Sequence, residues 1–419
     1  MTPVTRLSFA RYKAFSDQQD LELRAITLLF GFNSAGKSAA LRVLPVLAAA
    51  MRDRPPGTAV PSVFDYASPA IRGASFLDLL NSNHPGGAID FALDWPDAKL
   101  QFSVRNGGPS EGEFVSTYKY SSSFGGLEAR LGGDSAWSHD VVGPDGLNSG
   151  LAAFDGLGIS LSSPVGTQGD LERDANARLQ EFSASVHWLG SIRNRPPRFY
   201  FYGPGTSVLI AEDGAGTAEA LRASSIAKDG VSDAVSVWLR KACGCHLSFL
   251  ETEAQVVSGR NLYPFRLTST ANSATVSVQD VGEGIAQALP VVTLVHQAKC
   301  GLLGDRPVLA IEQPELHLHP RASVILADEI VQCIADGTKA VHVIETHSES
   351  VLLSVQTAIV DGRLNASEVI VYWVTEKNGA SFLMPVTFDE KGYPSENWPG
   401  SVFREAVSQA RQLNSIRSK

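Results

Sequence analysis

This chain of 419 residues lacks long apolar runs, a disulfide framework and a basic overall charge. It contains no stretch of about 18 uninterrupted apolar residues that could cross a membrane. Residues 1–9 lack the basic-then-apolar pattern of a secretory signal. The four cysteines, Cys243, Cys245, Cys300 and Cys333, fit a reducing compartment. We therefore expect a cytoplasmic protein that makes no membrane contact.

The sequence also lacks a complete zinc-binding pattern and long heptad repeats. The segment Cys243-Gly244-Cys245-His246 is not followed by a second pair with ligand spacing, so zinc is the minor alternative there and a reduced structural pair is favoured. Sustained heptads are also missing, which excludes a long coiled-coil arm.

The formal net charge of −9 does not suggest a nucleic-acid binder, so DNA contact, if there is any, must be local. One basic and aromatic cluster is present: Arg193, Arg195 and Arg198 with Tyr200 and Tyr202. Arginines that hold a lobe interface or phosphates explain this cluster better than contact with a DNA groove does.

The most informative segment follows the apolar run Ile26 to Phe30. It has the form G-x-x-x-x-G-K-S, a phosphate-binding loop between a strand and a helix. Backbone N–H groups of such a loop point at the β-phosphate, Lys37 reaches the β- and γ-phosphates, and the Ser38 hydroxyl ligates Mg²⁺. The nucleotide-contacting residues expected here are Gly31, Asn33, Ser34, Gly36, Lys37, Ser38 and Ala39.

Two downstream apolar runs end in acids. Val308 to Glu312 reads as a buried strand and is followed by Gln313 and Glu315, where a Mg²⁺-orienting carboxylate and a water-polarising group belong. Val341 to Glu345 reads as a second such strand, and His347 follows it. With Val369 to Val374 these runs predict strands covered on both faces, hence an α/β core.

Asp280 to Pro290 contains Gly282 and Gly284 at the opening of a predicted helix, which would offer bare N–H groups to an anion. Further helices are predicted over Asp170 to His187, Thr217 to Ala227 and Val231 to Cys243. We expect these three to form a helical lobe that carries Gly282 to Gln287.

Together, these motifs resemble the ABC-type ATPase heads of the SMC, RecF and OLD (overcoming lysogenization defect) proteins. The closest resemblance is to prokaryotic single-chain AAA/ABC ATPases with the pattern "IExPExHLHP … ETHSE", as found in antiphage defence systems. Trp188 to Arg198 resembles that group's "yLgplRxxP" segment, and Asn397 to Phe403 its "WPxGFF" ending. The resemblance covers roughly residues 1–105 and 185–405.

The resemblance implies an α/β P-loop NTPase of ABC-head type, with an N-terminal antiparallel β-lobe, a mixed core sheet and a helical signature lobe. The expected division is 1–104 for the N-terminal half of the core, 105–185 for a β-rich insertion, 186–300 for the helical lobe and 301–419 for the C-terminal half of the core.

The resemblance also assigns roles to single residues. Glu312 takes the place of the acid that orients Mg²⁺, His347 that of the switch histidine which contacts the γ-phosphate, and Gly282, Gly284 and Gln287 those of the signature helix. Gln313 stands where most such heads carry the glutamate that polarises water. Because Gln cannot accept a proton, the base would be Glu315 or the γ-phosphate itself, or hydrolysis would be slow.

Finally, the resemblance implies function. It predicts an ATPase that uses ATP and Mg²⁺, dimerises around nucleotide and controls a separately encoded nuclease or toxin. The alternative is an ATP-sensing scaffold with little hydrolysis that holds an effector protein.

Overall fold

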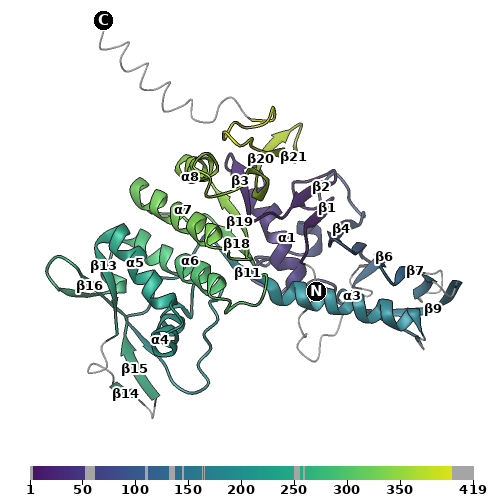
Figure 1. The fold of residues 1–419 in the computed structure, drawn as a ribbon. Coiled ribbons are helices and arrows are strands. Elements are labelled where there is room, and N and C mark those ends of the chain that lie inside the picture. Colours follow the sequence, from purple (N-terminus) through teal and green to yellow (C-terminus); the bar gives the residue numbers. More distant parts are fainter. Residues whose placement is uncertain are drawn as a thin grey trace, which may run out of the picture.

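A six-stranded mixed sheet runs through the middle of the computed structural model (Figure 1). The structure describes residues 3–51, 62–108, 112–131, 137–143, 146–162, 164, 166–249, 255–257 and 260–398. The strand order is β11 (Val186–Leu189), β18 (Val308–Glu312), β19 (Val341–Thr346), β3 (Ile26–Gly31), β20 (Val369–Lys377) and β21 (Ala380–Val386). Neighbours are parallel except β20 and β21. The carboxyl ends of β18, β19 and β3 therefore lie at one edge.

These strands are apolar on both faces because both faces are covered. Alternate residues of β3 and β18 enter two different hydrophobic cores: Leu29 and Ala310 face one, and Leu28 and Ile311 face the other. The helix α1 (Lys37–Ala49) packs on the first face. The helices α6 (Glu283–Lys299), α7 (Pro320–Ala335) and α8 (Glu349–Val360) cover the second.

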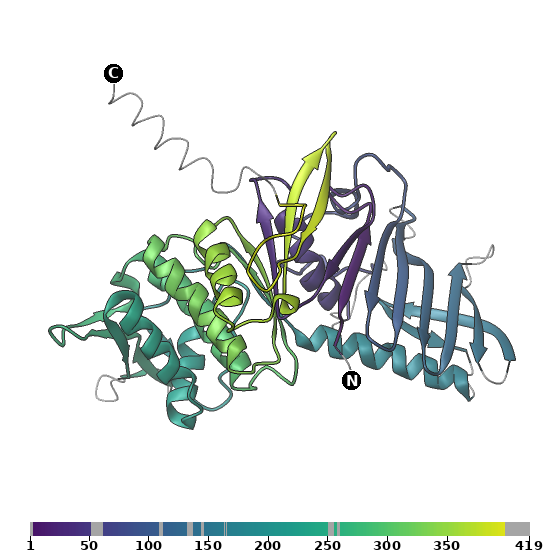
Figure 2. The same cartoon turned by 45° about the horizontal axis from the view of Figure 1, so that its top comes forward.

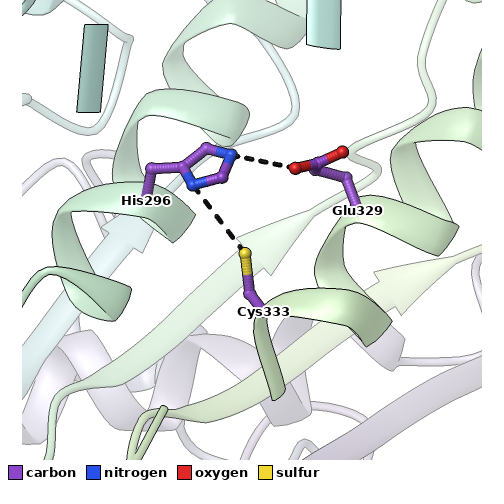
Figure 3. A group of neighbouring side chains, drawn as sticks. All are labelled: His296, Glu329 and Cys333. Atoms are coloured by element: carbon purple, nitrogen blue, oxygen red, sulfur yellow. Dashed lines mark hydrogen bonds and ion pairs between the residues drawn. The ribbon is translucent and has the colours of Figure 1, made fainter. Parts of the chain in front are cut away.

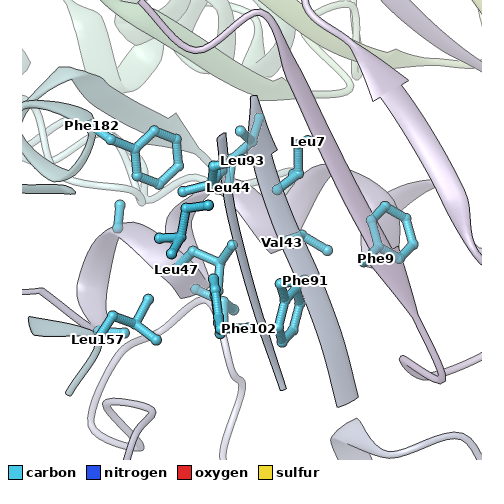
Figure 4. Packing of buried hydrophobic residues seen from close by; sticks show 14 of the residues in the cluster. Leu7, Phe9, Val43, Leu44, Leu47, Phe91, Leu93, Phe102, Leu157 and Phe182 are labelled. Atoms are coloured by element: carbon cyan, nitrogen blue, oxygen red, sulfur yellow. The ribbon is translucent and has the colours of Figure 1, made fainter. Parts of the chain in front are cut away.

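A nine-stranded antiparallel sheet forms the β-lobe (Figure 2). It contains β1 (Arg6–Ala10), β2 (Gln19–Glu22), β4 (Ile89–Asp94), β5 (Lys99–Asn106), β6 (Glu113–Ser122), β7 (Gly125–Leu131), β8 (Trp137–Gly143), β9 (Gly146–Asp155) and β10 (Gly158–Leu161). The strands β6 to β10, which lie within the predicted insertion, thus extend the sheet that β1, β2, β4 and β5 begin. A core of aromatic and branched side chains joins the β-lobe to α1, including Phe91 and Phe102 against Val43 and Leu47 (Figure 4).

The helix α3 (Thr167–Ser185) corrects one expectation. Its position in the sequence is close to the prediction, but it packs on α1 and on the β-lobe strands β6, β7, β8 and β10, and not in the helical lobe. The reason lies in its buried residues: Leu171, Ala175, Leu179 and Phe182 all enter the core that the β-lobe shares with α1.

The helical lobe lies on the other side of the core sheet (Figure 2). It contains α4 (Thr217–Ala227) and α5 (Val231–Cys243), as predicted; α4 contacts α6, and α5 contacts both α6 and α7. Two small sheets belong to it: β12 (Phe199–Phe201) with β15 (Arg260–Pro264) and β14 (Gln255–Val257), and β13 (Cys245–Ser248) with β16 (Arg266–Ser269) and β17 (Thr275–Ser277). The chain also forms the short helices α2 (Phe76–Leu79), η2 (Val278–Asp280) and η3 (Ala366–Glu368).

The strand order confirms the predicted fold class. The loop after β3 leads into α1, and β19 separates β3 from the acid-ending strand β18. With the antiparallel β-lobe and the helical lobe, this is the architecture of an ABC-type P-loop head. In the described part of the chain, no helix is long and apolar enough to cross a membrane. Of the predicted "WPxGFF" segment, residues 399–403 lie outside the described residues, and Trp398 packs edge-on against Phe388.

Candidate nucleotide site

The phosphate loop has a backbone that only glycine satisfies at two positions. Gly31 has φ +152°, and a Cβ there would lie 2.3 Å from the Val374 carbonyl oxygen. Gly36 has φ +102°, and its Cβ would lie 3.0 Å from the Phe15 ring. The loop therefore passes close to β20 on one side and to the β-lobe on the other, and a side chain at either glycine would displace it.

Lys37 begins α1 and folds back over the loop. Its buried Nζ donates to the carbonyl oxygens of Gly31 at 3.0 Å and Phe32 at 2.6 Å. Burial lowers the pKa of this ammonium, and the nearby charge of Glu345 opposes that shift. The cation is thus held at the mouth of the loop, where it can neutralise phosphate charge. Asn33 and Ser34 are exposed in the loop, and Ala39 is half-buried on α1.

Polar side chains from β19 and from the turn after β18 meet this loop. Ser38 Oγ donates to Glu345 Oε1 at 2.8 Å. His347 is half-buried, and its pKa is lowered by burial and by the Lys37 charge, while a hydrogen bond to the Gly31 backbone opposes the shift. His347 therefore lies beside the loop, and its assignment as the switch histidine stays a prediction.

Glu315 is held through one carboxylate oxygen. Its Oε1 accepts from Thr346 Oγ1 at 2.7 Å and from the backbone N–H of His347 at 3.1 Å. Its Oε2 is buried and has no hydrogen-bond partner among the described residues. One oxygen is thus held by two hydrogen bonds, and the other makes none among the described residues.

Glu312 is committed to a different contact. It is fully buried, and its two oxygens accept from Arg42 Nε at 2.6 Å and Arg42 Nη2 at 2.5 Å. Trp188 Nε1 also donates to Oε1 at 3.0 Å, and Arg72 lies 3.8 Å from Oε2. The structure therefore places this acid beside the site but in a buried ion pair with α1.

Arg42 and Trp188 had no role in the sequence prediction, and Glu345 entered it only through the ETHSE motif and as a fall-back base. A signal for Arg42 was present, since it is the one charge inside the apolar stretch of α1 after Lys37, and a buried charge needs a partner. Trp188 lay within the matched "yLgplRxxP" segment without a role.

Gln313 adopts a strained backbone directly after Glu312. Its φ is +42°, which is rare for a residue with a side chain, and its N–H donates to the Glu345 carbonyl oxygen at 2.8 Å. The strand pairing of β18 with β19 thus continues one residue further while the chain turns toward Glu315.

The signature residues lie in the helical lobe. Gly282 is exposed, and a Cβ there would meet nothing within 4 Å. Gly284 is buried, and a Cβ there would lie 2.3 Å from the His317 carbonyl oxygen. Gln287 is also buried and donates to the Arg193 carbonyl oxygen at 2.7 Å. Of the three, Gly282 alone faces solvent, and Gly284 and Gln287 pack within their own chain.

The three arginines of the basic cluster contact groups of the same chain. Arg193 is buried and donates to backbone oxygens of Gln287 and Glu312. Burial lowers its pKa to about 10. Arg195 lies 3.6 Å from Glu283, and Arg198 forms a two-bond ion pair with Asp280 at 2.6 Å. These contacts support the lobe-holding interpretation, because all three tie the segment to α6 or to the residues just before it.

A second group of ligand-type side chains connects α6 to α7 (Figure 3). Glu329 lies 3.2 Å from His296 Nε2, and Cys333 Sγ lies 3.9 Å from the other ring nitrogen, Nδ1. Glu329 and Cys333 contact different nitrogens of the His296 ring, so the two contacts are separate pairwise interactions. Burial also raises the pKa of the Cys333 thiol to about 12. This group is therefore a polar tie between two helices.

Comparisons with known proteins match one family model and several solved structures. Residues 182–354, less than half of the chain, match the family model "AAA domain, putative AbiEii toxin, Type IV TA system". No curated protein matches the chain. Three solved structures of SMC heads are similar to it. One is an Smc head bound to the C-winged helix domain of ScpA, with 11% identity and a TM-score of 0.47 over 92% of this chain and 98% of that chain.

The second is an Smc head with an extended coiled coil bound to the C-terminal domain of ScpA, derived from Pyrococcus furiosus. It has 11% identity and a TM-score of 0.45 over 100% of both chains. The third is the SMC head from Thermotoga maritima, with 10% identity and a TM-score of 0.38 over 92% of this chain and 99% of that chain.

The chain has the fold of an ABC-type P-loop ATPase head, and residues 182–354 match an AAA domain model. The arrangement of the loop and the side chains around it fits a nucleotide bound with Mg²⁺. Asn33 and Ser34 of the loop are exposed, Lys37 supplies a cation, and Glu315 and Glu345 each have one buried carboxylate oxygen without a hydrogen-bond partner in the described part of the chain.

Proposed function

We propose that the protein is an ATP-binding and ATP-hydrolysing switch that dimerises around nucleotide and controls a DNA-acting or toxic effector. The observation that carries the proposal is the meeting of Lys37, Ser38, Glu315 and His347 at the carboxyl edge of β3, β19 and β18. Phosphoryl transfer requires positioning and charge stabilisation more than covalent chemistry, and this edge supplies both.

Each group would have a separate task toward ATP. The loop N–H groups and Lys37 bind the β- and γ-phosphates, and His347 senses the γ-phosphate. Ser38 and a carboxylate of the site would hold Mg²⁺, and the resemblance assigns that carboxylate to Glu312. The ion would neutralise charge on the β- and γ-phosphates. Glu315 is the candidate base, because its free oxygen is buried beside His347 while its other oxygen is fixed.

Dimerisation is supported by the start of α6. No side chain among the described residues caps this helix, and Gly282 before it is exposed. Bare N–H groups at a helix N-terminus attract anions. In the proposed dimer this end of one chain would meet the γ-phosphate in the loop of the other chain, so that nucleotide binding stabilises association.

Control of an effector is the most specific part of the proposed function. The matched family model carries the description "putative AbiEii toxin, Type IV TA system", which supports a link to a toxin. A separately encoded nuclease or toxin remains the partner that the resemblance favours.

The alternative is an ATP-holding scaffold with little hydrolysis, and Gln313 favours it. A neutral side chain occupies the position of the usual base, on a backbone with φ +42°. In that case ATP would fix an assembly with an effector without turnover.

Sedimentation and turnover of the purified full chain test the proposal together. We expect ATP to shift the sedimentation coefficient from monomer to dimer, and hydrolysis to reverse the shift. A monomer at every ATP concentration rejects the dimer, and the absence of ATP binding rejects the nucleotide site itself.

A further inference from the structure

Two buried acids lie side by side at the edge of the core sheet. Glu312 of β18 and Glu345 of β19 are register partners, and their side chains are 0% and 2% exposed. Only the second of these acids has an open carboxylate oxygen. The two residues therefore differ in what each can offer to a cation beside Ser38.

Glu312 has little capacity left. Its Oε1 accepts from both Arg42 and Trp188, and its Oε2 accepts from Arg42 and faces Arg72. A cation bound there would lie next to a buried guanidinium and would compete with it. Removing Glu312 from Arg42 would also leave that guanidinium buried and unpaired, which is strongly unfavourable.

Glu345 has the opposite character. Its Oε1 accepts from the hydroxyl of Ser38. In a phosphate loop of this type, the hydroxyl at that position is a ligand of Mg²⁺. Its Oε2 is buried without a hydrogen-bond partner among the described residues. A buried carboxylate with an open oxygen lacks the partners that normally offset its desolvation. A hard divalent cation prefers such oxygen ligands.

We propose that Glu345, together with Ser38, supplies the protein ligands of the Mg²⁺ site, and that Glu312 anchors α1 through Arg42. This inference rests on the proposed nucleotide site and changes the assignment of its carboxylate from β18 to β19. Glu345 is thus a cation ligand at the end of the strand that also leads to the switch histidine His347.

The arrangement gives a direct connection between the cation and the switch. Glu345 and His347 are separated only by Thr346, whose hydroxyl donates to Glu315. A cation held by Glu345 would fix the end of β19 and, through Thr346, the orientation of Glu315. Loss of the cation would release Glu345, Thr346 and Glu315 together.

The test measures the factor by which Mg²⁺ tightens binding of a fluorescent, non-hydrolysable ATP analogue to the full chain, relative to binding in EDTA. The variants are Glu345→Gln, which keeps an acceptor for Ser38, and Glu349→Gln as the matched control on the exposed first turn of α8. We expect Glu345→Gln to lower the Mg²⁺ factor about tenfold or more. Its binding in EDTA should be equal to that of the wild type or tighter, because a negative charge near the phosphates is gone.

The outcomes separate the two levels of inference. An unchanged Mg²⁺ factor in folded Glu345→Gln overturns the metal assignment while leaving the nucleotide site intact. A wild-type chain that binds no analogue even with Mg²⁺ overturns the proposed function and this inference with it. If Glu345→Gln does not fold by circular dichroism, Glu345→Thr replaces it, since it is also neutral and keeps a hydroxyl beside Ser38, and the same drop is required.

Discussion

Arg42 and Glu312 form a buried two-bond ion pair that joins the first helix after the phosphate loop to the strand β18. The side chains are 4% and 0% exposed. The pair explains why α1 sits over β18 as well as over β3, and it means that substitution at Glu312 changes the fold's stability along with the site.

The first prediction follows from that pair. Glu312→Gln leaves Arg42 buried without a counter-charge, so we expect the free energy of unfolding to fall by about 3 to 5 kcal/mol. Urea denaturation followed by circular dichroism measures it. The double variant Arg42→Met with Glu312→Leu removes both charges and should recover most of the loss. A single variant as stable as the wild type contradicts the assigned anchoring role.

Lys37 should affect binding and not folding. Lys37→Ala removes the ammonium that neutralises β- and γ-phosphate charge, so we expect ATP binding and turnover to be abolished while the melting curve stays cooperative. Among the described residues its Nζ donates to two loop carbonyl oxygens, which water can satisfy in its place. Lys339→Ala is the control, because that exposed lysine pairs with Asp305 far from the loop in sequence. Equilibrium dialysis with ATP measures the effect, and retained affinity in folded Lys37→Ala would remove the site assignment.

Local patterns predicted the elements well. Gly216, Gly230 and Gly244 border α4 and α5 in left-handed backbone, and the apolar run ending at Glu312 gave β18 with its bounds. These features lie within a few residues of one another, so the sequence pattern contains them.

The missed features depend on residues far apart in the chain. Arg42 and Glu312 are 270 positions apart, and Ser38 and Glu345 are 307 apart. No periodicity in either segment says which acid faces which partner. The same reason explains why the packing of α3 was predicted wrongly. Its sequence pattern predicted a helix, but which core receives its apolar face depends on tertiary packing.

The two signature glycines should behave differently. Gly284→Ala places a Cβ 2.3 Å from a backbone oxygen of the turn after β18, so we expect a stability loss of about 1 to 3 kcal/mol. Gly282→Ala meets nothing within 4 Å and should be close to neutral for stability. Thermal melts of both variants measure this difference.

Because Gly282 can be changed without an internal clash, it is the position for testing the dimer. Gly282→Trp should leave analogue binding by the monomer intact and prevent the ATP-dependent increase in sedimentation. Unimpaired dimer formation by Gly282→Trp would exclude the start of α6 from the interface.

His342 gives a pH dependence of stability. It is fully buried on β19, and burial lowers its pKa from 6.5 to about 4, although its Nδ1 lies 3.2 Å from the Ala25 carbonyl oxygen. Above pH 6.5 both folded and unfolded states hold this ring neutral. Below it the unfolded chain takes up a proton that the folded chain cannot, so stability falls as the pH drops from about 6.5 toward 4.

The matched comparison is His342→Asn, which keeps a donor for Ala25. Between pH 7 and pH 4.5 the wild type should lose about 2 kcal/mol more of its unfolding free energy than the variant does. Denaturant titrations at the two pH values measure this difference. Equal losses would show that His342 is not held neutral by the fold.

The identity of the base decides between an enzyme and a scaffold. Glu315→Gln keeps an oxygen that can accept from Thr346 and His347 but removes the proton acceptor, so with Glu315 as the base turnover should fall about 10²-fold or more. Gln313→Glu should then change it little. If the protein is a scaffold, wild-type turnover should lie well below the usual enzyme median of about 10 s⁻¹, and Gln313→Glu should raise it. Steady-state phosphate release from the three proteins makes the distinction. Fast wild-type hydrolysis that is indifferent to Glu315→Gln would contradict both versions and leave His347 and Glu345 as the remaining groups beside the loop that could accept the proton.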